Sequence, residues 1–499
     1  MDHRSARRLL AAAIVLGFLA QAFLHRTALG VNLVLLVGAL LASAVLIRRP
    51  GARLDLLDAW IPLAALAFAG FVAIRADPFL VFVDTLAALG LGAAAVAAIG
   101  GAGLTRRSLF GLGFVALRGL GLVLGGAIEP IRESRPASGA DGLRVRVARF
   151  APLLRGLLIA LPLLVIFAAL FAAADAVFSR GLSDVLAIQV PLGELPIRLV
   201  LAALVAWIAA GLLVAVVREV FPPEARSLGA AAATTALPLP RLGVTEAVVV
   251  LAAVDVLFAV FVGLQVTYLF GGRDTLAATG LTYSDYARRG FFELIAVGFL
   301  AGGLIAALEI VVAARSRAYL ASAAALTSLA LVVLASATLR MKLYQDAYGW
   351  TELRLYAYAA IAWLGLGAIA TVALLAAGRM RWLAHVLGIL AVVVALAVNA
   401  VGPQGFVAGQ DLARAIDPSL VAPGGETGLD ARYLGTLGDD AVPVMIQAVP
   451  YVSGLDRSFL EAQIRGRAHA LAAPEVTAWP AWNLARERAR VALAAYSGP

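Results

Sequence analysis

The sequence predicts an all-α, polytopic membrane protein, a transmembrane helical bundle with about eleven spanning helices. Hydrophobic residues make up 62% of the 499 positions and charged residues only 14%, whereas a soluble domain carries about a quarter charged residues. The apolar residues gather in runs of about 20, the length that an α-helix needs to cross the hydrocarbon core of a bilayer. Short turns rich in arginine, glycine and proline separate these runs.

The composition also excludes several classes of function. The chain has no cysteine and only four histidines, none of them at ligand spacing, so thiolate chemistry and the common metal sites are not expected. No P-loop, dinucleotide fingerprint or Ser-His-Asp pattern is present. We therefore expect no cofactor and no metal. The net charge of +9 lies mostly in loops between apolar runs, which indicates membrane orientation rather than nucleic-acid binding.

Residues 1–101 are predicted to form an N-terminal four-helix membrane segment. Three arginines precede the first apolar run, and positive charge favours the cytoplasmic side, so the N-terminus is expected to be cytoplasmic. The four predicted spans cover residues 9–25, 28–47, 57–74 and 79–101.

Residues 102–150 are predicted to form a basic cytoplasmic loop that contains one further apolar helix, 109–127. If 109–127 does not span, most Lys and Arg residues fall on the cytoplasmic side, whereas they divide about evenly if it does. Arg118 would also lie inside the membrane in the second case. We therefore interpret 109–127 as an interfacial or re-entrant helix, and we expect the basic loop to contact anionic lipid headgroups.

Residues 151–402 are predicted to form a seven-helix membrane core, and residues 403–499 a small helical domain. Basic turns at 315–317 and 379–381 suit the cytoplasmic side. An odd number of spans then leaves the C-terminal region extracytoplasmic. The seven predicted spans cover residues 151–173, 196–217, 244–270, 290–313, 318–338, 354–377 and 382–401.

Several motifs resemble a bacterial family of polytopic membrane proteins. The most specific is the run YSDYARRGFFEL, residues 283 to 294, and a second is LRMKLYQDAYGWTELRLYAY, residues 339 to 358. On these motifs the chain is similar to the domain of unknown function four-one-seven-three, related to four-one-five-three, over residues 150–450. The resemblance implies a multi-pass protein of the bacterial inner membrane, and it implies no reaction, substrate or ligand.

Two intramembrane acids are candidate functional residues. Asp255 lies near the middle of the span 244–270, where a charge costs about 2.5–3.5 kcal/mol and is by default a functional hypothesis. Glu309 on the next span is expected about one helical turn closer to the cytoplasm. The two carboxyl groups could relay a proton or hold a cation. Alternatively, a protonated Asp255 could serve as a packing hydrogen bond between helices.

A polar cluster is predicted on the outer face, where the loops 271–289 and 339–353 meet. Such a cluster could bind a polar substrate or a lipid headgroup. Alternatively, its tyrosines and arginines could be ordinary interface anchors. Its members are Tyr268, Tyr283, Tyr286, Arg288, Arg289, Glu293, Arg340, Lys342, Tyr344, Tyr348, Glu352 and Arg354.

Three hypotheses for the function remain open. The first is transport of a small solute, ion or lipid with Asp255 and Glu309 as coupling acids. The second is an envelope signalling or assembly scaffold that binds a protein partner through the outer loops and the C-terminal tail. The third is an enzyme that acts on a lipid-linked substrate through outer-face carboxylates. The lipid bilayer is the expected partner in each case, and nucleic acid in none.

Overall fold

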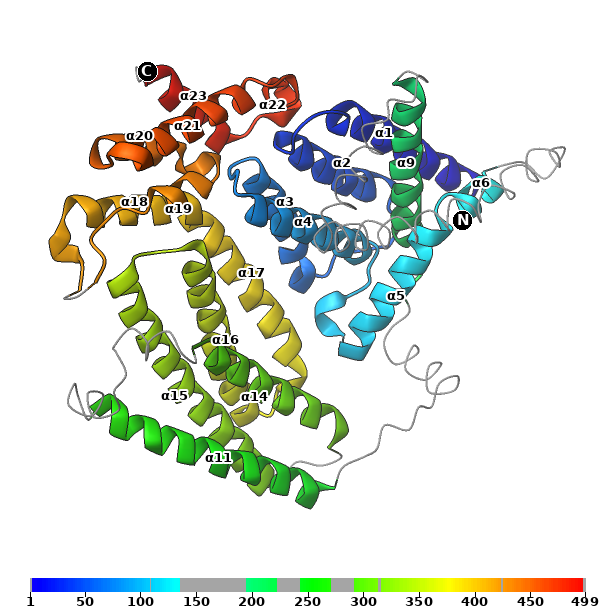
Figure 1. Ribbon diagram of the computed structural model, residues 1–499. Helices are drawn as coiled ribbons and strands as arrows, with labels where there is room; N and C mark the ends of the chain where they lie inside the picture. The colour runs from blue at the N-terminus through cyan, green and yellow to red at the C-terminus, as the bar shows by residue number, and fades with distance from the viewer. Residues whose placement is uncertain are drawn as a thin grey trace, which may run out of the picture. The chain divides into compact units, whose positions relative to one another are not determined.

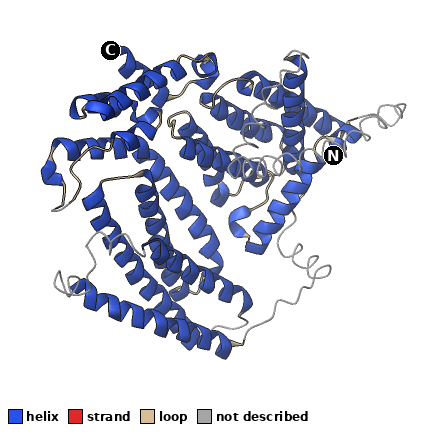
Figure 2. Cartoon of the chain, in the orientation of Figure 1, coloured by secondary structure: helices blue, strands red, loops and turns tan. Residues whose placement is uncertain are grey.

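The computed structural model describes residues 2–107, 109–134, 194–221, 243–270, 291–312, 316–422 and 425–496. Every regular element in these ranges is a helix (Figure 1; Figure 2). Apolar runs form helices in a bilayer because the hydrocarbon offers no hydrogen-bond partners, so each segment must satisfy its own backbone groups. The all-α fold class is therefore confirmed for the described part of the chain.

Seven of the described helices are long and apolar enough to cross a membrane. They are α1 (His3–Leu24), α4 (Pro78–Ile99), α9 (Leu195–Val217), α11 (Val244–Phe270), α15 (Arg317–Tyr348), α16 (Glu352–Ala376) and α17 (Leu383–Val401). Three further predicted spans coincide with shorter apolar stretches in α2 (Val31–Ile47), α3 (Trp60–Val72) and α14 (Phe291–Val311). The predicted span 151–173 lies outside the described residues. The total of eleven spans stays a prediction.

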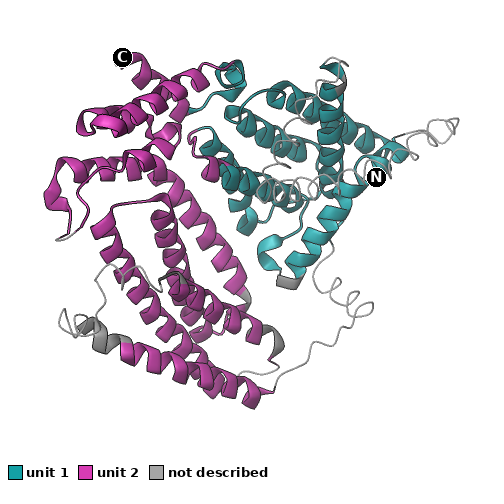
Figure 3. Ribbon diagram, in the orientation of Figure 1, with its two compact units in different colours: residues 1–73, 82–230, 474–483 teal, residues 74–81, 231–473, 484–499 magenta. Residues whose placement is uncertain are grey.

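The chain forms two compact units (Figure 3). Unit 1 comprises residues 1–73, 82–230 and 474–483, and unit 2 comprises residues 74–81, 231–473 and 484–499. Each unit therefore combines segments that are far apart in the sequence. The four domains predicted from the sequence follow different limits and stay predictions.

Unit 1 is built on the antiparallel pair of α1 and α9. Arg26, just after α1, pairs with Glu194, just before α9, at 2.6 Å. Along the pair the two backbones approach closely, because a Cβ atom at Gly17 would collide with the carbonyl oxygen of Ala202. Small residues permit such close contacts between membrane helices. Leu9 on α1 and Leu213 on α9 are fully buried.

The segment formed by α5 (Leu109–Gly125) and α6 (Ile128–Glu133) begins and ends near the same end of α9. Arg107, before α5, donates to the carbonyl oxygen of Phe221 at 3.4 Å. Glu133, which ends α6, pairs with Arg218 at 2.5 Å. Between the two helices Gly126 has a φ of +52°, which is a left-handed conformation that glycine adopts without steric cost.

Unit 2 contains α11, α14, α15, α16 and α17, with a shared apolar core. The core includes Leu251 of α11, Ile305 of α14 and the fully buried Leu326 of α15. Tyr319, near the start of α15, is also fully buried in this cluster. Dispersion contacts between such close-fitting side chains, rather than a hydrophobic driving force, hold helices together within lipid.

The C-terminal helices of unit 2 form a layer that we call the C-terminal layer. It consists of α18 (Pro403–Ile416), α19 (Ala431–Thr436), the 3-10 turn η5 (Asp439–Ala441), α20 (Val442–Ala448), α21 (Gly454–Leu471) and α23 (Leu484–Ala495). Its own core contains Val407 of α18, Leu434 of α19, Met445 of α20 and Leu460 of α21, each at most 2% exposed. The layer is therefore a packed structure rather than a loose tail.

Candidate functional site

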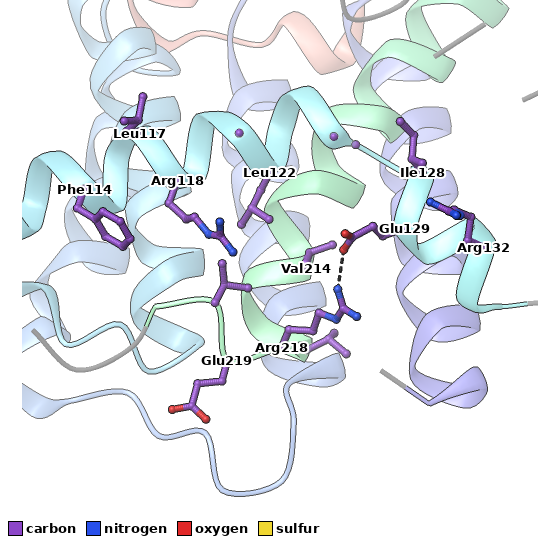
Figure 4. Close-up of a pocket in the computed structure, with 15 residues that line it drawn as sticks. Phe114, Leu117, Arg118, Leu122, Ile128, Glu129, Arg132, Val214, Arg218 and Glu219 are labelled. Atoms are coloured by element: carbon purple, nitrogen blue, oxygen red, sulfur yellow. Dashed lines mark hydrogen bonds and ion pairs between the residues drawn. The ribbon is translucent and has the colours of Figure 1, made fainter. Parts of the chain in front are cut away.

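A large cavity in unit 1 lies between α5, α6 and the C-terminal end of α9 (Figure 4). Its volume is about 1020 Å³, and apolar and charged side chains share its lining. The charged members are Arg118 of α5, Glu129 and Arg132 of α6, and Arg218 and Glu219 after α9.

Glycines shape the walls of this cavity. Gly121, Gly125 and Gly126 all line it, so no side chain from these residues fills the space. Gly126 also lies against the indole of Trp207, and a Cβ atom there would collide with the ring. Gly211 of α9 lies equally close to the backbone of Leu122. The glycine-rich sequence of α5 thus lets α5 pack closely on α9 and leaves room beside the contact.

The charged residues of the cavity divide into paired and unpaired groups. Arg218 pairs with Glu129 at 2.5 Å and with Glu133 at 2.5 Å, and Glu219 pairs with Arg49 at 3.3 Å. Arg118 and Arg132 make no hydrogen bond or ion pair with any described residue. Within the described part of the chain, the acids of the cavity are therefore neutralised by other arginines, and the guanidinium groups of Arg118 and Arg132 have no anionic partner.

The chemistry of these groups favours an anion with several oxygen acceptors. A guanidinium group presents its N–H donors in a planar fork that fits phosphate and carboxylate oxygens. A basic side chain beside an apolar wall can hold a charged head while the apolar wall contacts an attached hydrocarbon chain. The cavity has both features. Sequence reasoning identified the basic loop 102–150, to which Arg118 and Arg132 belong, but gave no pairing partner or cavity.

Asp255, the first predicted intramembrane acid, lies on α11 and is partly buried. It faces Ser322 on α15, and its Oδ1 atom is buried without a hydrogen-bond partner among the described residues. Glu309, the second, belongs to α14, but its side chain lies outside the described set. The predicted pairing of these two acids therefore stays a prediction.

The structure brings together only some members of the predicted outer-face cluster. The guanidinium carbon of Arg354 lies 4.2 Å from the ring centre of Tyr344, whose ring contacts Tyr348 at 5.0 Å. Lys342 pairs with Asp346 one turn away at 2.7 Å. Glu293 is exposed in the first turn of α14, and Arg340 is half-buried. Outside the described side chains lie Tyr268, Tyr283, Tyr286, Arg288 and Arg289.

Glu352, another predicted member, is part of a buried polar network. Its Oε1 accepts from Nε2 of Gln404 at 3.0 Å, and its backbone N–H donates to the hydroxyl of Tyr433 at 2.9 Å. One turn along α16, the hydroxyl of Tyr356 donates to Oδ2 of Asp77 at 2.9 Å. The network thus joins α16 to the C-terminal layer and to the segment before α4.

A second network joins α18 to the end of α15. Oδ1 of Asp411 accepts from the backbone N–H of Trp350 at 2.8 Å. Arg414 is 8% exposed and donates to the carbonyl oxygens of Asp346 at 2.9 Å and Ala347 at 3.3 Å. Arg414 therefore satisfies the carbonyl groups that the last turn of a helix leaves without partners.

Arg75 satisfies the last carbonyl groups of α17 in the same manner. Its Nε donates to the carbonyl oxygen of Asn399 at 2.7 Å, and Nη2 donates to that of Ala400 at 2.9 Å. Its guanidinium group also pairs with Asp440 at 3.5 Å, and Asp440 accepts from the backbone N–H of Ala76 at 2.6 Å. Both helix ends thus carry an arginine, buried for Arg414 and half-buried for Arg75, beside a carboxyl group of the C-terminal layer.

Burial perturbs the titration of the acids and the tyrosine in the C-terminal layer. It raises the pKa of Asp411 to about 6, although the Trp350 N–H and the charges of Arg414 and Arg354 act in the opposite direction. It raises the pKa of Asp440 as well, against the effects of Ala76 and Arg75. Burial also raises the pKa of the Tyr433 hydroxyl to about 12. In each case the cause is desolvation, which penalises the charged form of a buried group.

Sequence reasoning did not identify most members of these networks as site residues. Those it missed are Arg75, Asp77, Tyr356, Gln404, Asp411, Arg414, Tyr433 and Asp440. Gln404 and Asp411 are seven residues apart in one amphipathic helix, a spacing that places them on the same face. That signal identifies a polar stripe but not its partners. Among the described residues no group of three or more His, Cys, Asp or Glu side chains could hold a metal ion, and the expectation of no cofactor stays a prediction.

The helices and the cavity together define a multi-pass, all-α membrane protein with a charged cavity in unit 1. The chain belongs to the family described as Domain of unknown function (DUF4153), whose model matches residues 62–448. This match confirms the resemblance seen in the sequence, and it falls on the second of the two related families. Neither the curated proteins nor the solved structures contain a match to the chain.

Proposed function

We propose that this protein binds the anionic headgroups of lipids at the cytoplasmic face of a bacterial inner membrane. The observation that carries the proposal is the pair Arg118 and Arg132 in the cavity beside α5 and α6, which make no hydrogen bond or ion pair with any described residue. The cavity volume of about 1020 Å³ exceeds what a phosphate group alone would fill. We infer that it takes a phosphate together with part of the attached glycerol and acyl chains.

The charge distribution of unit 1 supports the cytoplasmic assignment. The cavity lies at the same end of α9 as Arg49, which pairs with Glu219, and as the start of α1, where Arg7 donates to the carbonyl oxygen of Ser134 at 3.4 Å. Clustered arginines at one end of a helical bundle favour the cytoplasmic side. That side carries the anionic lipid surface to which basic segments bind.

A binding titration tests the proposal. The detergent-solubilised full chain is titrated with short-chain phosphatidylglycerol, with short-chain phosphatidylcholine as the neutral headgroup. Each arginine near an anionic lipid contributes about 1 kcal/mol, so Arg118→Gln combined with Arg132→Gln should weaken phosphatidylglycerol binding by about 30-fold. The matched control is Arg317→Gln combined with Arg379→Gln, which removes two exposed arginines of unit 2 and should leave binding unchanged.

Two outcomes would overturn this proposal. One is unchanged phosphatidylglycerol affinity in the cavity variant, and the other is equal affinity for both headgroups in the wild type. Inorganic phosphate serves as a competitor in the same titration. Complete displacement of the lipid at comparable phosphate concentrations would instead identify a site for soluble anions.

Transport of a small solute or ion is the second candidate function. One observation favours it, namely that the buried Oδ1 atom of Asp255 has no hydrogen-bond partner among the described residues, because intramembrane carboxyl groups often relay protons or hold cations. Asp255→Asn, compared with wild type in a deletion strain across pH, tests this role. A variant that reaches the membrane at normal levels but does not complement would support transport, whereas full complementation would assign Asp255 to packing.

A further inference from the structure

A second cavity of unit 1, which we call the apolar cavity, lies between α4, α5 and the C-terminal part of α9. Its volume is about 400 Å³, and pockets of this size hold small ligands. All of the described residues that line it are glycine, alanine, leucine, valine or phenylalanine. These residues offer dispersion contacts to a hydrocarbon and no side-chain hydrogen bond to a polar group.

Small residues on two helices leave this space open. The wall on α4 contains Gly90, Ala93, Ala94 and Ala97, and Gly119 lies in the wall on α5. A Cβ atom at Gly90 or at Gly119 would have open space around it. Neither glycine is therefore needed for a close contact between helices, and a larger side chain at either position has room to extend into the cavity.

The apolar cavity is distinct from the charged cavity that Arg118 and Arg132 line, although both border α5. Ala116 and Val123 line the apolar cavity, whereas Phe114 and Gly121 line the charged one. With 3.6 residues per turn, these two pairs lie on opposite faces of α5. Among the described residues only Leu122 borders both cavities.

The apolar cavity follows α4 through one half of the bilayer. This helix has 22 residues and is therefore about 33 Å long, close to the hydrocarbon thickness of about 30 Å. Gly90 lies about 18 Å from the start of α4, near its middle, whereas Ala97 lies near its end. One half of the hydrocarbon core is also the depth that the acyl chains of one leaflet occupy.

The apolar cavity extends from an exposed apolar surface into the interior of unit 1. Leu120 is 55% exposed, whereas Ala97, Val115 and Ala215 are buried. Because α4 and α9 are candidate spans, hydrocarbon surrounds the mouth. A buried water molecule needs two to four polar partners, and an empty space forfeits the dispersion contacts of its lining. An acyl chain from the surrounding lipid restores these contacts without any polar partner.

We propose that the apolar cavity is a binding site for one acyl chain of a membrane phospholipid, inserted from the leaflet in which α4 ends. No described polar side chain lines the cavity, so it selects a hydrocarbon chain and not a headgroup. This inference goes beyond headgroup binding and uses neither Arg118 nor Arg132.

Photo-crosslinking of the full chain in phosphatidylcholine nanodiscs tests this site. The probe is phosphatidylcholine with a diazirine on one acyl chain, and mass spectrometry of the peptides locates the labelled residues. Lipids at the protein surface label exposed residues such as Leu120 in any case. Labelling of the buried residues Ala97, Val115 and Ala215 is the expected result, because it requires a chain inside the cavity.

Two variants that fill the cavity supply the comparison. Gly119→Leu and Gly90→Leu should each reduce labelling of the three buried residues by about tenfold, which corresponds to overpacking by about 1.4 kcal/mol. The two substitutions lie on different helices, so one remains informative if the other does not fold. The matched control is Gly113→Leu, because Gly113 is exposed on α5, has open space around its Cβ and lines neither cavity. This control should retain the wild-type labelling.

Either of two results would overturn the acyl-chain site. One is labelling of the wild type that is confined to exposed residues, and the other is unchanged labelling of the buried residues in both filling variants. Arg118→Gln combined with Arg132→Gln should keep the labelling, and Gly119→Leu should keep the wild-type affinity for short-chain phosphatidylglycerol. Failure of the acyl-chain site and failure of headgroup binding are therefore distinguished.

Discussion

Asp411 lies in a buried environment where its charge is poorly solvated. Its pKa is raised to about 6 in the folded protein from the ordinary value of 3.8. The folded state therefore binds more protons than the unfolded state between about pH 4 and pH 6, and stability falls as the pH rises through this interval. Well above pH 6 the ionised Asp411 carboxyl lowers the free energy of unfolding by about 3 kcal/mol relative to a solvated carboxylate.

Asp411→Asn should remove this part of the pH dependence. The amide oxygen can still accept from the Trp350 N–H, and no charge is desolvated. We expect thermal unfolding in detergent to show a higher midpoint for the variant at pH 7.5 and little difference at pH 4.5. Asp417→Asn is the control, because Asp417 is exposed on the same segment. An unchanged pH profile in Asp411→Asn would contradict the assignment.

Gly402 offers a second test at the scale of one residue. Its φ is +70°, and a Cβ atom there would collide with the guanidinium group of Arg75. Gly402→Ala should therefore destabilise unit 2 by about 1–3 kcal/mol. Gly409→Ala on α18 has open space around its Cβ and should be neutral or stabilising by up to about 1 kcal/mol. Equal midpoints for the two variants would rule out the collision.

At the scale of elements, a buried arginine holds α18 on the end of α15. Arg414 donates to the carbonyl oxygens of Asp346, Ala347 and Glu426. The shorter glutamine side chain in Arg414→Gln cannot reach all three oxygens. Because buried acceptors then remain unsatisfied, the free energy of unfolding should fall by about 2–4 kcal/mol. The control Arg488→Gln removes an exposed arginine of α23 and should lower the free energy of unfolding by less than about 0.5 kcal/mol. Limited proteolysis after Gly349 would show whether α18 is released in Arg414→Gln alone.

The helices themselves could be predicted from the sequence, whereas their polar contacts could not. Long apolar runs specify spans such as α11 and α16, because an α-helix forms all its backbone hydrogen bonds within its own segment and the hydrocarbon core offers no other partners. The hydrogen bond between Tyr356 and Asp77 joins residues 279 positions apart, and no local pattern encodes such a pair. Glu352 and Arg354 were predicted as members of one outer-face cluster. In the structure Glu352 bonds to Gln404, whereas Arg354 stacks on Tyr344, and this difference depends on packing that only the folded chain defines.

At the scale of the whole molecule, the two polar ends of unit 1 differ in composition. One end gathers Arg7 and Ser134, together with Arg53 in an exposed loop. The other gathers Ala28 and Glu475, whose backbones share a hydrogen bond of 2.9 Å. Because α5 and α6 begin and end at the arginine-rich end, the predicted re-entrant arrangement requires Ser134 to face the same compartment as Arg53.

The absence of cysteine from the sequence makes this arrangement directly testable. Single-cysteine variants Arg53→Cys, Ser134→Cys and Glu475→Cys are probed in intact cells and in inverted vesicles with a membrane-impermeant maleimide. We expect the first two to react only in inverted vesicles and Glu475→Cys only in intact cells. If α5 crossed the membrane, Ser134→Cys would react in intact cells and Arg53→Cys would not. That result would move Arg132 of the cavity to the outer face and remove the basis for cytoplasmic lipid binding.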